Sequence, residues 1–199
     1  VTPYYNKTSQ NGLITHYSHI ADSISTSIIL YNVPSRTGVN ILPETYNILS
    51  EHPNICATKE ANGNISSVAK TISLCGEKLD VYSGNDDQIV PILALGGIGV
   101  ISVFSNVCPK ECHEIVHEFM SGNVLQSREL QLKYLKLIET LFCDVNPIPV
   151  KEALNLMGYN CGECRLPLEK LSEENLNKLK NIMKEHNIIK KTEGEKMVP

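Results

Sequence analysis

A lysine at the end of an apolar run is the residue of this sequence best suited to covalent chemistry. Lys59 directly follows the run 54–58, whose composition is typical of a buried strand. A strand buried on both faces would carry the ammonium group into a closed pocket, where loss of hydration lowers the pKa of a lysine and frees its amine to attack carbonyl carbons. The alternative is that Lys59 reaches solvent or pairs with Glu60, and strand position alone favours neither interpretation.

Residues at the ends of neighbouring apolar runs add groups that suit an α-keto acid. Arg36 can hold a carboxylate through two parallel hydrogen bonds, and Tyr31 or Tyr5 can move a proton at a reacting carbonyl. Each tyrosine taken singly is explained as well by an ordinary core aromatic with a satisfied hydroxyl group. Together with Lys59, the set predicts keto-acid chemistry through a lysine amine.

A repeated unit of strand, turn and helix would bring these side chains to one edge of a parallel sheet. As far as about residue 120, four short apolar runs alternate with segments whose apolar residues recur at helical spacing. The runs are residues 27–31, 54–58, 79–82 and 99–103. Strands that alternate with helices predict parallel pairing, and functional groups gather where such strands end.

Residues 1–120 and 121–199 differ in their patterns. Residues 1–5 have the composition of a strand end, Pro43 lies where a first helical turn would begin, and Gly76 follows the end of a helical segment. Beyond residue 120 no strand-like run occurs, and helices are expected at 124–141, 150–157 and 172–186, the last with an acidic first turn. Four strands are fewer than an eight-stranded barrel or a usual open sheet requires, so an upstream part is expected.

Composition favours an enzyme of small molecules. The net charge is −4 and no basic block occurs, so we expect no nucleic-acid partner and no membrane partner, and no apolar run approaches the roughly 18 residues of a membrane span. A cytoplasmic location and reduced thiols are expected, because seven scattered cysteines do not resemble a disulfide framework. Cys161 and Cys164 have the spacing of a redox motif, but their context favours an ordinary loop over a redox or metal site.

Several motifs, taken in order and spacing, resemble the dihydrodipicolinate synthase family from Val1 to about residue 189. They are Tyr4-Tyr-Asn-Lys7, Tyr31-Asn-Val-Pro-Ser-Arg-Thr-Gly38, Lys59-Glu-Ala61, Ser83-Gly84, Gly96-Gly97, Gly99-Val-Ile-Ser102, Asn146-Pro-Ile-Pro-Val-Lys151 and Arg165-Leu-Pro-Leu168. The resemblance implies an α/β fold, a (β/α)8 TIM barrel with a C-terminal helical subdomain. Of this fold the chain would supply only the C-terminal half of the barrel, from the end of strand four to strand eight (1–120), and the helical subdomain (121–199).

The resemblance also implies catalytic roles, position by position. Lys59 resembles the lysine that forms the Schiff base, and Tyr31 resembles the general acid and base held over it. Tyr5 matches the tyrosine that reaches across a dimer interface into the partner's proton relay. Arg36 matches the entrance residue that binds the carboxylate of the aldehyde substrate.

Three further positions match binding sites of the family. Gly84 and the backbone of Ile101 correspond to the pyruvate pocket, and Tyr4 corresponds to an aromatic residue near the allosteric lysine site of some members. The implied reaction condenses pyruvate with L-aspartate-4-semialdehyde in diaminopimelate and lysine biosynthesis, as a lyase that needs no metal or organic cofactor. The implied assembly is a homodimer or homotetramer, and these 199 residues alone are expected to be inactive without the N-terminal half.

Three alternatives remain beside this hypothesis. N-acetylneuraminate lyases and keto-deoxy-sugar-acid aldolases share the tyrosine and the lysine, but they typically lack the arginine, so Arg36 favours the synthase. A non-catalytic fragment is a second alternative, because half a barrel leaves an open sheet edge. The third is a zinc hydrolase, since His113-Glu-Ile-Val-His117 matches H-E-x-x-H; its place in a helix after the last strand, away from the strand ends, disfavours it.

Overall fold

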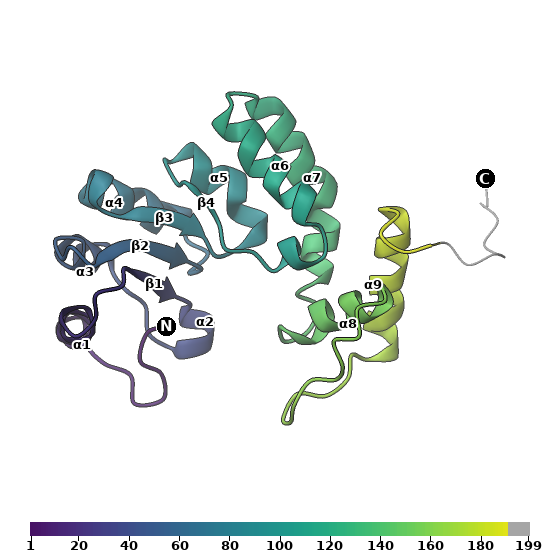
Figure 1. Ribbon diagram of the computed structural model, residues 1–199, viewed down its shortest axis with the longest axis horizontal. Coiled ribbons are helices and arrows are strands. Elements are labelled where there is room, and N and C mark those ends of the chain that lie inside the picture. The colour runs from purple at the N-terminus through teal and green to yellow at the C-terminus, as the bar shows by residue number, and fades with distance from the viewer. Residues whose placement is uncertain (191–199) are drawn as a thin grey trace. The chain divides into compact units, whose positions relative to one another are not determined.

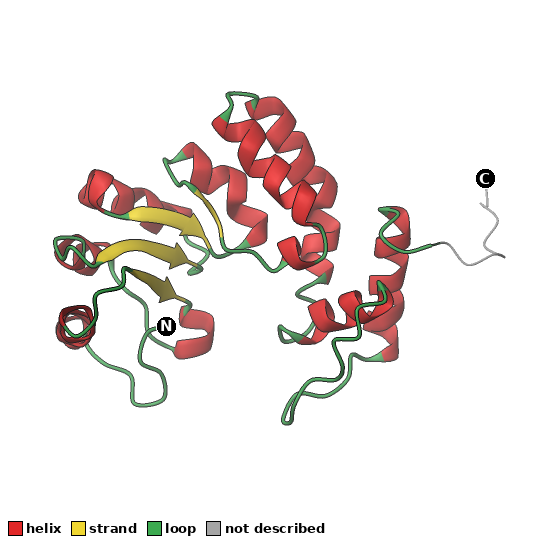
Figure 2. Ribbon diagram, in the orientation of Figure 1, coloured by secondary structure: helices red, strands yellow, loops and turns green. Residues whose placement is uncertain are grey.

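Residues 1–190 are described by a computed structural model, in which the chain forms two compact units (Figure 1). One unit comprises Val1–Ser102 together with Val116–Val124, and the other comprises Val103–Ile115 together with the chain from Leu125 onward. Strands occur in the first of these units and helices in both (Figure 2). Residues 191–199, which the predicted helical region includes, lie outside the described residues.

The first unit contains a parallel sheet of four strands in the order β1-β2-β3-β4. The strands are β1 (Ile28–Asn32), β2 (Ile55–Glu60), β3 (Asp80–Ser83) and β4 (Gly99–Val100). All four predicted runs are therefore strands, and their parallel pairing is confirmed. The predicted run 99–103 is paired over two residues only.

Residues 1–5, predicted as the end of a strand, form no strand in the structure. A strand needs a ladder of paired backbone groups, whereas the segment is held here through a side chain. The Thr2 hydroxyl donates to the hydroxyl oxygen of Thr37 at 2.9 Å, and both residues are buried.

Helices alternate with the strands of this unit along the chain, and several of their ends match local sequence signals. They are α1 (Gln10–Asp22), α2 (Pro34–Thr37), α3 (Pro43–Leu49), α4 (Ile65–Cys75) and α5 (Ile89–Ala94), with 3-10 turns η1 (Gly76–Lys78) and η2 (Asp86–Gln88). Pro43 is the first residue of α3 and Gly76 ends α4, as predicted. The Asn64 side chain accepts a hydrogen bond from the backbone N–H of Ser67 at 3.0 Å, which caps the start of α4.

An apolar core fills the space between these helices and one face of the sheet, and α1, α3 and α4 lie side by side next to the strands in Figure 1. Leu13 and Tyr17 of α1, Tyr46 of α3, Leu30 of β1 and Ile55 of β2 all belong to the same buried cluster. Side chains alternate between the two faces of a strand, so the residue after Leu30 points to the opposite face. The helices thus pack against the face of the sheet that carries Leu30, and Tyr31 lies on the opposite face.

The second unit is helical in the described residues. Its elements are η3 (Phe104–Asn106), most of α6 (Pro109–Met120), α7 (Val124–Thr140), α8 (Ile148–Leu156) and α9 (Glu173–Glu185). The three helices predicted after residue 120 are present. The Ser172 hydroxyl caps α9 by accepting from the backbone N–H of Asn175 at 3.3 Å. Leu137 of α7 and Leu179 of α9 are fully buried.

None of the described helices is both long enough and apolar enough to cross a membrane.

Candidate functional site

Lys59 is the penultimate residue of β2 and stands between two tyrosines of the neighbouring strands. In the sheet register, Tyr31 of β1 pairs with Lys59, and Lys59 pairs with Tyr82 of β3. The Lys59 Nζ atom lies 4.4 Å from the centre of the Tyr31 ring. Lys59 was predicted directly after a strand; it lies within one, because β2 continues through Glu60 with partners on both sides.

Burial shifts the pKa values of Lys59 and Tyr31 away from their ordinary values. Removal from water lowers the pKa of the Lys59 amine, the negative charge of Asp86 opposes this shift, and the positive charge of Arg36 lowers the pKa further. Burial raises the pKa of the Tyr31 phenol, against the opposing effect of Arg36. The direction of the Lys59 shift increases the neutral, nucleophilic fraction of the amine, and the raised pKa of Tyr31 favours its protonated form.

Arg36 lies in α2, the short helix that begins two residues after β1. Its charge acts on both Lys59 and Tyr31, so the structure brings together the three residues that the sequence predicts as the core of the site. The turn is fixed by Thr37, whose buried hydroxyl donates to the backbone oxygen of Val39 at 3.0 Å. A rigid turn limits the movement of the guanidinium group that it carries.

Gly84 follows β3 where two strand ends approach closely. Its backbone N–H donates to the backbone oxygen of Glu60 at 2.7 Å, and a Cβ atom at this position would lie 2.7 Å from the Ala61 Cβ. Glycine is therefore required by the approach of the backbones. Ile101 follows β4 and is 37% exposed, and its N–H donates to the backbone oxygen of Ser83 at 2.9 Å.

Tyr4 and Tyr5 lie in the loop before α1 and are exposed, by 68% and 90% respectively. With so much of its surface free, Tyr5 is not packed against Lys59 or Tyr31 within this chain. Tyr5 and Lys7 both have positive φ angles, 63° and 55°, which are uncommon for residues with side chains. Such a conformation costs about 1–3 kcal/mol, and residues that adopt it cluster at functional sites.

Two buried acids near Lys59 were not predicted as site residues. Asp86 is 2% exposed and acts on the charge of Lys59. Glu60 is 3% exposed, and its carboxylate accepts hydrogen bonds from Asn32 and Tyr46, so the alternative in which it is the partner of Lys59 is not what the structure shows. The sequence signal that could have identified these two acids is their position at or after the end of an apolar run. Acidic side chains are rarely buried, so burial alone would not have been expected.

The H-E-x-x-H motif lies in α6, where His113 and His117 are both exposed. Among residues 1–190, no group of three or more histidine, cysteine or acidic side chains has a metal-binding arrangement. Cys161 is exposed and Cys164 partly buried, and both thiols are free of disulfide bonds.

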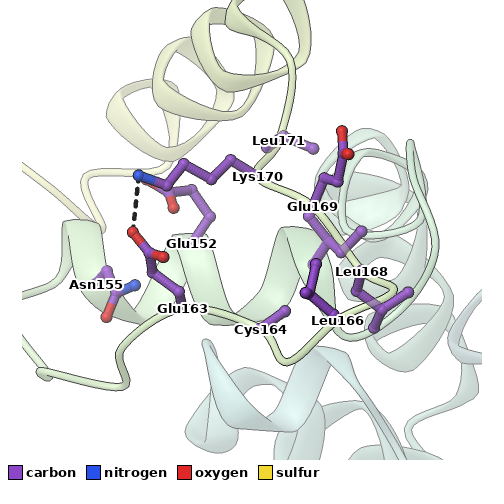
Figure 3. Close-up of a pocket in the computed structure, with 10 residues that line it drawn as sticks. Glu152, Asn155, Glu163, Cys164, Leu166, Leu168, Glu169, Lys170 and Leu171 are labelled. Atoms are coloured by element: carbon purple, nitrogen blue, oxygen red, sulfur yellow. Dashed lines mark ion pairs between the residues drawn. The ribbon is translucent and has the colours of Figure 1, made fainter.

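A hollow of about 700 Å³ in the second unit is lined by α8 and by the segment 163–171 (Figure 3). An ion pair between Glu163 and Lys170, at 2.7 Å, lies at its wall. Leu166 and Leu168 supply apolar surface. The hollow holds no residue predicted to be catalytic, so the group around Lys59 is the candidate site.

Comparison with known proteins places this geometry in a family. The chain is 57% identical over 188 residues to the 4-hydroxy-tetrahydrodipicolinate synthase of Caldicellulosiruptor bescii, an alignment that covers 94% of this chain and 63% of the relative. The crystal structure of dihydrodipicolinate synthase from Thermotoga maritima superimposes with a TM-score of 0.92 at 47% identity, covering 94% of this chain and 65% of the other.

A third relative is a structure with a ligand. The chloride-inhibited dihydrodipicolinate synthase from Acinetobacter baumannii, complexed with pyruvate, superimposes with a TM-score of 0.91 at 41% identity, covering 94% of this chain and 65% of that one. The chain thus spans 63–65% of the length of these three relatives. The solved relatives imply the TIM-barrel α/β fold, with which the parallel sheet agrees.

Residues 1–186, nearly the whole of the described chain, match the sequence pattern of the Dihydrodipicolinate synthetase family. The order of the motifs, the parallel sheet and the lysine between two tyrosines all agree with that match. We conclude that the chain belongs to the dihydrodipicolinate synthetase family.

Proposed function

We propose that the full-length protein is a 4-hydroxy-tetrahydrodipicolinate synthase, which condenses pyruvate with L-aspartate-4-semialdehyde through a Schiff base on Lys59. The observation that carries the proposal is a partly buried amine of lowered pKa, 4.4 Å from the centre of a tyrosine ring and within the field of an arginine. The name of the relative from Caldicellulosiruptor bescii and the pyruvate bound to the synthase from Acinetobacter baumannii support the same reaction.

In the proposed mechanism, the neutral amine of Lys59 attacks the carbonyl carbon of pyruvate and water leaves to give an imine. Tyr31 transfers protons in this step, and loss of a methyl proton then gives an enamine. The enamine carbon attacks the aldehyde, the adduct cyclises, and Lys59 is released. Arg36 binds the carboxylate of the aldehyde substrate, and Gly84 with the backbone of Ile101 lines the pyruvate pocket.

We further propose that the chain supplies the C-terminal half of a (β/α)8 barrel in residues 1–120 and a helical subdomain in residues 121–199. The four parallel strands and the 63–65% coverage of the relatives support this division. The assembly is proposed to be a homodimer or homotetramer in the cytoplasm. In it, Tyr5 enters the partner's proton relay and Tyr4 lies near an allosteric lysine site; the exposure of both tyrosines and the positive φ of Tyr5 support this proposal.

The test is trapping of pyruvate on the full-length protein by borohydride, followed by intact-mass and peptide analysis. The expected result is one reduced pyruvyl group on Lys59, which the Lys59→Ala substitution abolishes. Lys70→Ala is the control, because Lys70 is an exposed residue of α4 paired with Glu44 and should leave trapping unchanged. Absence of a mass increase on Lys59 in the unsubstituted protein would refute the proposal.

A further inference from the structure

A buried hydrogen-bond network lies on the face of the sheet opposite to Lys59. The Glu60 carboxylate accepts from Asn32 Nδ2 at 3.0 Å to each oxygen, from the Tyr46 hydroxyl at 3.0 Å and from the backbone N–H of Asn62 at 2.9 Å. Asn32, Tyr46 and Glu60 are each at most 3% exposed. The Asn32 amide and the Asn62 N–H can only donate at these contacts, so carboxylate oxygens fit them. Burial raises the pKa of the Glu60 carboxyl, and its hydrogen bonds oppose this shift.

The network joins Asn32 and Glu60, the residues that follow Tyr31 and Lys59 in their strands. Asn32 follows Tyr31 in β1 and Glu60 follows Lys59 in β2, and the two pairs are consecutive in the strand register. Adjacent residues in a strand point to opposite faces, so the link between Asn32 and Glu60 lies directly behind the contact between Tyr31 and Lys59.

The residue before Lys59 is fixed by the same group. The Thr58 hydroxyl donates to the Tyr46 hydroxyl oxygen at 3.0 Å, and Tyr46 in turn donates to Glu60. Both neighbours of Lys59 in β2 are thus hydrogen-bonded to the Tyr46 side chain of α3, one of the helices that cover this face of the sheet. Asn32 is fixed as well, because its Oδ1 accepts from the backbone N–H of Ile41 at 3.1 Å.

We infer that Glu60 is a positioning residue for the reaction at Lys59: its carboxylate joins the ends of β1 and β2 and thereby sets the distance between the Lys59 amine and the Tyr31 ring. This inference rests on the function proposed above. Glu60 acts through geometry, because its side chain faces away from the proposed pyruvate pocket and contacts neither reacting group. Misplacement by about 1 Å can lower the rate of a positioned reaction by about 100-fold.

The substitution that tests the inference is Glu60→Gln in the full-length protein, which keeps the shape and turns one acceptor into a donor. At least one N–H or O–H in the network then faces another donor, so the strand ends shift. The measurement is the first-order rate of pyruvate trapping by cyanoborohydride at saturating pyruvate, as a function of pH. We expect the plateau rate to fall by about 10- to 100-fold, with less than about threefold change in half-saturating pyruvate.

A change of position differs from a change of charge in the pH profile. Under the inference, the pH midpoint of trapping stays within about half a unit while the plateau falls. A shifted midpoint with an unchanged plateau would mean that Glu60 acts on the Lys59 proton by its charge, and it would overturn the inference. An unchanged profile in the folded variant would overturn it equally.

Rescue and control variants separate positioning from loss of stability. Asn32→Asp combined with Glu60→Gln reverses the polarity of the link. Asn32 Nδ2 also donates to Asn40 Oδ1 at 2.8 Å, and the Asn40 amide can turn to donate to the new carboxylate. We expect the double substitution to recover at least about tenfold of the rate lost by Glu60→Gln alone. Ser127→Ala is the matched control. It removes a buried hydrogen bond of 2.6 Å from the Ser127 hydroxyl to the backbone oxygen of Ile115, and both residues belong to the second unit. It should lower the melting temperature and leave the trapping rate unchanged; an equal rate loss in this control overturns the inference.

Tyr46→Phe provides the test if Glu60→Gln does not fold. It deletes only the hydroxyl that ties Thr58 and Glu60 to α3, and a plateau loss of about 3- to 10-fold is expected. A folded Tyr46→Phe protein with an unchanged plateau refutes the inference. If the unsubstituted protein itself fails to trap pyruvate on Lys59, the proposed function has failed, which is a different result from equal trapping by the protein and its variants.

Discussion

Substitution of Gly84 by alanine tests whether the close approach of β2 and β3 holds the candidate site in place. A Cβ at residue 84 would lie 2.7 Å from the Ala61 Cβ and 3.0 Å from the Glu60 backbone oxygen. Carbon atoms in contact are normally about 3.5–4.0 Å apart, so the two segments must separate by about 1 Å. The same shift weakens the 2.7 Å hydrogen bond from the Gly84 N–H to the Glu60 oxygen.

The expected cost of Gly84→Ala is about 1–3 kcal/mol of unfolding free energy, the usual range for an added methyl group without space. Because the shift is next to Lys59, we also expect the pyruvate-trapping rate to fall by up to about 100-fold. Urea unfolding of the full-length protein measures the first quantity, and borohydride trapping measures the second.

Gly99→Ala is the matched control for this prediction. Its Cβ would meet the Tyr82 ring at 3.4 Å, an ordinary contact, and Gly99 has no positive φ angle. Both substitutions restrict the unfolded chain to the same extent, by about 0.4–1 kcal/mol, so their difference isolates the clash. If the two variants have equal stability and equal trapping rates, the reasoning from the close approach is wrong.

Two further predictions concern ionisation and burial. Pyruvate trapping should rise with pH through the pKa of Lys59, because only the neutral amine attacks. Burial lowers that pKa, so the midpoint of the rise should lie below 10.5. Asp86→Asn should move the midpoint to still lower pH, because the charge of Asp86 raises the pKa of Lys59. A midpoint that moves upward in this variant would contradict the assignment. Tyr17→Phe should keep or increase stability, because the buried Tyr17 hydroxyl, whose pKa burial raises to about 12, has no hydrogen-bond partner among residues 1–190. Urea unfolding checks this, and a loss above about 1 kcal/mol would refute it.

The sequence alone predicted the central group of the candidate site because strand order brings it together. Tyr31 ends one apolar run and Lys59 directly follows the next, and parallel pairing in register places such residues side by side. Arg36 follows the same strand as Tyr31 after a short turn, so its approach to both residues also depends on local sequence. The structure brings these three residues together, and their roles in the reaction stay predictions. The roles of Tyr4 and Tyr5 stay predictions as well, and both side chains are exposed in this chain.

Other features depend on contacts between distant segments, which local patterns do not encode. An acid next to a lysine suggested an ion pair, but alternation along β2 places Glu60 on the face that packs against α3, where Tyr46 meets it. The shortness of β4 and the absence of a strand at residues 1–5 likewise depend on which backbone groups find partners. Composition and spacing do not specify those partners.

The position of Lys59 between Tyr31 and Tyr82 also has a spectroscopic consequence. These 199 residues contain eight tyrosines and no tryptophan, so their near-ultraviolet absorption and fluorescence come mainly from phenol rings. An ammonium group 4.4 Å from the Tyr31 ring imposes an electric field on it, and this field changes when the nitrogen loses its charge. Loss of the charge on the Lys59 nitrogen should therefore change the contribution of Tyr31 to the ultraviolet signal of the protein.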